Sequence, residues 1–108
     1  MPAAAVIEND IRQLLDSPSS GDEAPTLAHI EDALTTGYAH SMALEAEQSR
    51  LQRRIADLAV ELVDDDDALP DPELKRLAQE LKATCRSLVS LRTLLDSLRT
   101  RADAARAA

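Results

Sequence analysis

Apolar residues recur every third or fourth position along two long stretches of this chain, and that spacing constrains the fold more than any other feature. The first stretch begins at Leu27 and the second at Leu74. Such spacing gives each helix one apolar seam, and two helices of this kind pack seam to seam as a coiled coil. The pattern therefore predicts an all-α fold with two long arms, over about residues 26–63 and 72–105. The seam positions expected to join the arms are Leu44, Leu51, Ile55, Leu58, Leu88, Leu91, Leu95 and Leu98.

The segment between the arms, residues 64–71, carries the signals that end one helix and begin another. It opens with four successive carboxylates, which lie at the negative end of the first helix dipole and repel one another. Asp71 and Pro72 are residue types preferred at the N-cap and the first position of a helix. A short connection between two long amphipathic helices produces an antiparallel hairpin. We therefore expect a hairpin over residues 26–108 that turns at an acidic loop.

Charged residues beside the seams test this arrangement. If the hairpin folds about the acidic loop, Glu31 meets Arg106 and Glu45 meets Arg92, and each pair is opposite in charge. Exposed ion pairs stabilise a fold by only a few tenths of a kcal/mol, so these pairs select the antiparallel register more than they add stability. The same alignment brings together Tyr38 and Arg99, Gln52 and Cys85, and His40 and Arg101.

A short amphipathic helix is predicted before the hairpin, within residues 1–16. Its apolar face consists of Ile7, Ile11, Leu14 and Leu15. Ser17 and Pro18 end the helix, and residues 17–25 have the small, polar composition of a flexible linker. Two interpretations of this helix stand side by side. It folds back onto the hairpin, or it docks in a groove of another protein.

A single hairpin in a chain of 108 residues offers a thin core, because each arm buries only one stripe of side chains. The chain also holds more apolar residues than one seam uses. Those that lie off the seam are Met42, Val60, Val63, Val89 and Leu94. We therefore expect two hairpins to pair as a homodimer in a four-helix bundle. The alternative is that the N-terminal helix folds back and covers the exposed apolar stripe within one chain.

Composition excludes several classes of function. Tyr38 is the only aromatic residue, so no stacking platform for bases and no ring-lined ligand pocket can form. The 2 Gly are too few for a phosphate-binding loop, and the single Cys85 excludes a disulfide within the chain and a Cys-based zinc site. A formal net charge of -8 argues against nucleic-acid or membrane partners. We expect no catalytic residue, metal, cofactor or small-molecule substrate, and a cytoplasmic location.

The sequence GYAHS, which begins at Gly37, interrupts the apolar seam of the first arm. Gly37 and Ser41 fall on the seam itself, and Tyr38 falls beside it. Small residues on a seam let the facing helix approach closely, so we expect a packing notch here. We expect the ring of Tyr38 to lie against Arg99 at the edge of this notch.

The stretch YAHSMALEA around His40 resembles the helix of phosphotransfer domains and of histidine kinase dimerisation domains that presents one exposed His. The resemblance covers one helical turn. Dimerisation helices follow the His with an acid, but here Ser41 follows; phosphotransfer domains place Lys and Gly where this chain has Ala43 and Leu44. The resemblance implies His40 as a phosphoryl acceptor, whereas its place beside the seam predicts a solvated polar residue.

A second alternative function is nucleic-acid binding by arginines at heptad spacing, which are Arg92, Arg99 and Arg106. The cross-arm ion pairs described above explain the same spacing and fit the acidic net charge better. The sequence therefore predicts a non-enzymatic coiled-coil interaction module that self-associates and serves another protein as an adaptor, scaffold or regulatory partner.

Overall fold

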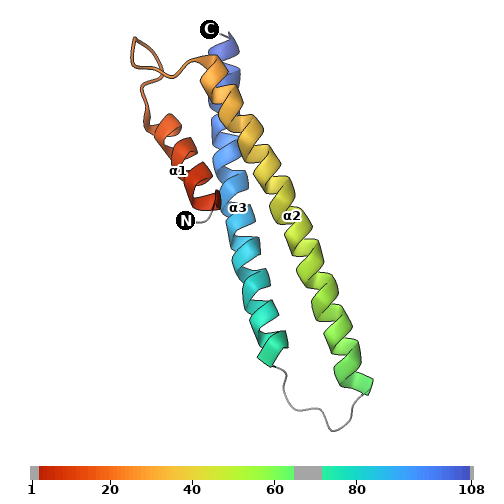
Figure 1. The fold of residues 1–108 in the computed structure, drawn as a ribbon. Helices are drawn as coiled ribbons and strands as arrows, with labels where there is room; N and C mark the ends of the chain where they lie inside the picture. Colours follow the sequence, from red (N-terminus) through yellow and green to blue (C-terminus); the bar gives the residue numbers. More distant parts are fainter. Residues whose placement is uncertain (1–2, 65–71, 108) are drawn as a thin grey trace.

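A computed structural model describes residues 3–64 and 72–107, and within these ranges the chain is helical except for residues 17–26 (Figure 1). The helices are α1 (Ala3–Asp16), α2 (Leu27–Asp64) and α3 (Pro72–Ala107). The long helices α2 and α3 lie antiparallel, and α1 lies beside them at the end away from their connection (Figure 1). The prediction of an all-α hairpin preceded by a short helix is confirmed. The predicted acidic loop, with its N-cap Asp71, lies outside the described residues except for Asp64.

The described helix ends follow from local chemistry. Thr26 caps α2, because its Oγ1 accepts a hydrogen bond from the backbone N–H of His29 at 3.1 Å. Helix α3 begins at Pro72, whose ring fixes a helical φ and whose missing N–H is not needed there. After α1, Gly21 adopts a φ of 94°, and its carbonyl accepts a hydrogen bond from Ala24 at 3.2 Å. This left-handed conformation favours Gly and turns the chain back toward the start of α2.

Three helices build the core in the half of the hairpin that carries α1, which we call the covered half. Ile11 and Leu14 of α1 pack here with residues from both long helices. The buried members from the long helices are Ile30, Leu34, Leu91, Leu95, Leu98 and Ala102. Because α1 packs against both long helices here, it covers side chains at the edge of the seam that α2 and α3 alone would leave exposed to water.

In the other half of the hairpin the described residues form only the two long helices, and we call it the uncovered half. Its buried residues are Leu51, Leu58 and Leu77. The seam residues Ile55, Leu74 and Leu81 pack against them but remain half-buried. The molecule is therefore a rod of 68 × 23 × 15 Å whose core is thick at one end and thin at the other. Among the described helices, none is long and apolar enough to cross a membrane.

Candidate interaction surfaces

The predicted seam residues lie inside the hairpin. Leu51 and Leu98 have no exposed surface, and Leu58, Leu88, Leu91 and Leu95 are at most 4% exposed. Leu44 and Ile55 are half-buried against the two clusters. The seam residues therefore pack against each other within this chain. In the covered half, little of their surface is left for contact with a partner.

The two predicted ion pairs across the hairpin are present. Arg106 donates to the Glu31 carboxylate at 3.2 Å, and Arg92 donates to the Glu45 carboxylate. Both pairs are about half-exposed, so they specify the register of the helices more than they stabilise it. Two arginines of the proposed nucleic-acid stripe are thus engaged within the chain, and Arg99 is exposed.

The alignment of Gln52 with Cys85 stays a prediction, and the partner that the structure gives Cys85 is Gln48. The side chain of Gln48 donates a hydrogen bond to the Cys85 sulfur at 3.1 Å, and Gln52 is exposed. Gln48 occupies the seam itself, one turn earlier, and a side chain there points directly at the facing helix. This polar pair fills the seam between the two apolar clusters.

Gly37 is buried and lies where α1 and α3 both meet α2. A Cβ atom added to Gly37 would collide with the end of the Leu95 side chain and would lie 3.4 Å from Cδ1 of Ile11. Ser41 is 7% exposed, and its hydroxyl donates to the Tyr38 carbonyl at 2.8 Å. Tyr38 is 39% exposed, and its stacking on Arg99 stays a prediction.

His40 differs from the prediction of a solvated residue. Its Nε2 atom is buried and has no hydrogen-bond partner in the part of the chain that the structure describes. His40 lies on the same flank of the hairpin as Ala33, against which the α1-containing core packs. A phosphoryl donor needs access to an imidazole nitrogen, and Nε2 does not offer it; phosphoryl acceptance by His40 stays a prediction.

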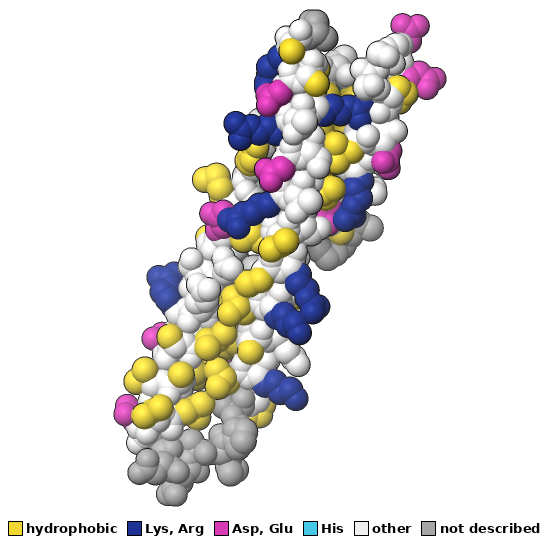
Figure 2. All heavy atoms as spheres, turned by 180° about the vertical axis from the view of Figure 1, so that it is seen from behind, with side chains coloured by type: hydrophobic (Ala, Val, Ile, Leu, Met, Phe, Trp, Pro, Cys, Tyr) yellow, Lys and Arg dark blue, Asp and Glu magenta, His cyan; other side chains and the backbone are white. Residues whose placement is uncertain are grey.

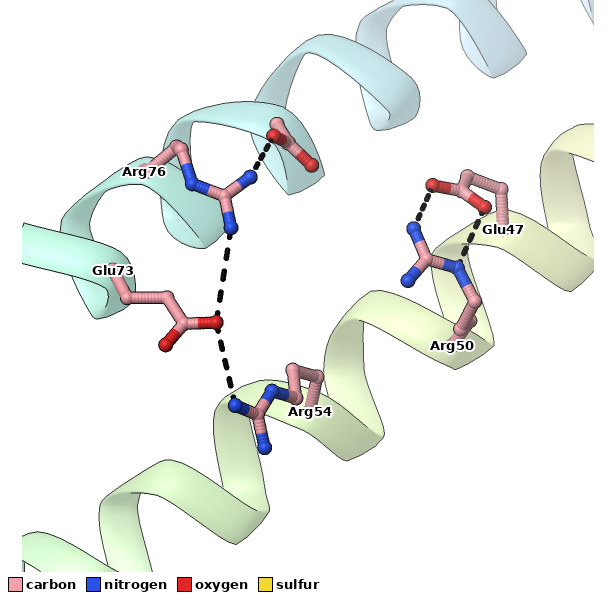
Figure 3. Close-up of polar contacts among 6 residues, drawn as sticks. Glu47, Arg50, Arg54, Glu73 and Arg76 are labelled. Atoms are coloured by element: carbon pink, nitrogen blue, oxygen red, sulfur yellow. Dashed lines mark hydrogen bonds and ion pairs between the residues drawn. The ribbon is translucent and has the colours of Figure 1, made fainter.

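A network of ion pairs crosses the uncovered half on one flank (Figure 3). The Glu73 carboxylate of α3 lies 3.3 Å from Arg54 of α2 and 3.7 Å from Arg76. Along α2, Arg50 binds Glu47 with two hydrogen bonds of 2.5 and 2.9 Å, and these lower the pKa of the Glu47 carboxyl. Because that pKa is lowered, the stabilisation by this pair is present at neutral pH and is lost as the pH falls through the carboxyl's pKa.

Helix α1 folds back onto the hairpin, so the structure favours the first of its two interpretations. Ile11 and Leu14 are 1% and 6% exposed, and Ile7 and Leu15 are half-buried against the same core. A single side chain of α3, that of Arg101, clamps the end of α1. Its guanidinium donates to the carbonyls of Leu14, Leu15, Ser17 and Pro18 at 2.6, 2.9, 2.6 and 2.5 Å.

The clamp follows from helix electrostatics. The last turn of α1 has no basic residue of its own, and its carbonyl groups form the negative end of the helix dipole. Arg101 supplies the missing positive charge from another helix. The guanidinium of Arg101 is thus engaged by α1, and its predicted approach to His40 stays a prediction.

We expect Arg101→Ala to release α1 while the hairpin stays folded. Hydrogen bonds from a charged group contribute about 1.5–3 kcal/mol each when partly buried, so amide exchange in α1 should accelerate by about tenfold or more. Hydrogen exchange followed by mass spectrometry measures this directly. Arg99→Ala is the matched control, because Arg99 is exposed two residues away on the same helix. Unchanged exchange in α1 of Arg101→Ala would show that apolar packing alone holds the helix.

An open groove of about 590 Å³ lies between α1 and α2. We call it the α1–α2 groove. It is lined by Ile7, Asp10, Ile11, Gln13, Leu14, Ser17, Glu23, Pro25, His29, Asp32, Ala33 and Thr36. The sequence pattern did not predict this groove, since its existence depends on which long helix α1 approaches more closely.

Comparisons with protein-family models, with curated proteins and with solved structures found no match to this chain.

Proposed function

We propose that this protein is a non-enzymatic coiled-coil interaction module that self-associates, two hairpins forming a four-helix bundle, and that the dimer serves another protein as an adaptor, scaffold or regulatory partner. The observation that supports this proposal is the apolar surface of the hairpin away from α1. Two features of that surface matter: the incomplete burial of its seam and the large apolar side chains that lie beside it.

The seam is incompletely buried in the uncovered half. In this two-helix arrangement the facing helix covers some seam residues fully, such as Leu51, but leaves others open to water at one side. Ile55, Leu74 and Leu81 are half-buried for this reason, although they occupy the same kind of position as fully buried residues in the covered half. A second hairpin packed on this surface removes them from water, as α1 does in the other half.

Large apolar side chains add to this surface. Met42, Val63 and Val89 are 67%, 77% and 65% exposed. Their heptad positions place them on the flank opposite the one where Ala33 and Arg101 contact α1. Figure 2 shows apolar side chains gathered along the uncovered half, between the two long helices. An extended apolar surface of this kind is typical of an interface between protein chains.

The self-association is tested by light scattering coupled to size exclusion. We expect a mass twice the 11.7 kDa of the chain. Val63→Glu with Val89→Glu should give a monomer of unchanged helicity, because in a symmetric interface the new carboxylates face each other and are desolvated. The matched control adds the same charge at exposed positions of the other flank, Ala43→Glu with Ala83→Glu, and should stay dimeric. A monomeric wild-type protein would overturn the proposal.

A further inference from the structure

The α1–α2 groove has an apolar floor and an acidic rim. Ile11 is buried and Ile7 and Ala33 are half-buried, so these three lining side chains form its floor. Three carboxylates stand around it, and they come from three different segments of the chain: Asp10 from α1, Glu23 from the linker and Asp32 from α2. Folding thus brings together an apolar surface and a cluster of negative charge that neither helix carries alone.

None of these three carboxylates forms an ion pair with the residues that the structure describes. Arg101, which reaches the backbone of the groove residues Leu14 and Ser17, is engaged by the carbonyl groups at the end of α1. The described His, Cys, Asp and Glu side chains also form no cluster with the geometry of a metal site. The rim therefore presents negative charge to an organic cation, and the floor presents apolar surface beneath it.

We propose that the α1–α2 groove binds a basic amphipathic helix of a partner protein. Apolar side chains of that helix fill the floor, and its Lys or Arg side chains extend along the floor to reach the carboxylates at the rim. The new helix lies beside α1, as a fourth helix of the covered half. This binding site is separate from the self-association surface, which lies on the opposite flank of the hairpin.

A second copy of this chain is a poor occupant for the groove. Its Lys and Arg side chains with no hydrogen-bond or ion-pair partner among the described residues are Arg53 on α2 and Lys75, Lys82, Arg86 and Arg99 on α3. The buried apolar side chains of both helices are turned into the hairpin seam. Among the described residues of α3, Val89 is the only large apolar side chain that is exposed, at 65%. A helix that offers both an apolar stripe and flanking cations must therefore come from a different protein.

The test uses the full chain and a synthetic peptide of about 14 residues, the length of α1, with Leu at helical spacing and Lys elsewhere. We expect saturable binding by fluorescence anisotropy that weakens with salt, and no binding of the same peptide with Glu for Lys. Asp10→Asn with Asp32→Asn should weaken binding about tenfold, since two charge pairs are lost from a partly apolar site. Thr36→Trp, which fills the groove without changing charge, should weaken binding as well.

The matched control removes two carboxylates outside the groove, in Asp57→Asn with Asp96→Asn, and should bind like wild type. Equal weakening by both double variants would overturn the proposal, since the peptide would then respond only to net charge. Absence of binding by the Lys peptide would overturn it too. If Asp10→Asn with Asp32→Asn changed the oligomeric mass, the groove would hold a second copy instead. If the proposed dimer does not form, only the light-scattering result changes and peptide binding does not. Each of the two proposals can therefore be refuted without the other.

Discussion

Replacing Leu98 by Ala is expected to lower the free energy of unfolding by about 2–5 kcal/mol, the largest effect of any single truncation proposed here. Leu98 has no exposed surface and lies in the three-helix core of the covered half. Truncation removes apolar contacts with α2 and α1 and leaves a cavity that surrounding helices close only in part. Urea denaturation followed by circular dichroism measures the loss, at one fixed protein concentration because association would couple to folding.

Thr100→Ala is the control for Leu98→Ala. Thr100 lies two residues further along α3, and its exposed hydroxyl donates only to a carbonyl of its own helix, that of Asp96. We expect the free energy of unfolding to change by less than about 1 kcal/mol. A comparably small loss in Leu98→Ala would mean that the covered half is not a tightly packed core.

Gly37→Leu is expected to destabilise the protein by about 1–3 kcal/mol, even though Leu is a better helix former than Gly. The intrinsic preference for a non-Gly residue in a helix would add up to about 1 kcal/mol of stability. Packing opposes this gain, because even a Cβ at Gly37 would collide with Leu95, which is 1% exposed and cannot move into solvent. Ile11 stands in the way of the remaining atoms, so α1 should loosen together with the hairpin.

Two further variants separate packing from helix propensity. Ala39→Leu places the same side chain on an exposed position two residues along α2 and should leave stability nearly unchanged. Leu95→Ala in the Gly37→Leu background opens space in the facing helix and should recover part of the loss, a coupling that a double-mutant cycle measures. If Gly37→Leu and Ala39→Leu unfold at the same urea concentration, the notch is not a close contact.

The long helices were predictable because their signals are local. Apolar spacing, the Pro72 start and the run of acids each act within a few turns, so the sequence displays them directly. The pairs of Glu31 with Arg106 and Glu45 with Arg92 followed once the turn between the arms was placed. Two helices that share one seam have little freedom to slide along each other, so the ion pairs between them could be predicted correctly.

The position of α1 was not predictable in the same way. Its apolar face specifies only that it must be buried, and both a partner and the hairpin satisfy that condition. The clamp by Arg101 joins residues 83 to 87 positions apart, and no short-range pattern encodes it. The α1–α2 groove depends on the same long-range packing, and neither it nor the burial of His40 Nε2 was predicted.

The clamp also sets an order of events when the chain folds. The docking surface for α1 consists of residues from both long helices, and Arg101 lies near the far end of α3. Contacts between neighbouring helices form early, whereas closing so long a loop is slower. Helix α1, synthesised first of the three, must therefore wait with Ile11 and Leu14 exposed until α3 is complete. During that interval its apolar face is open to chaperones and to other nascent chains.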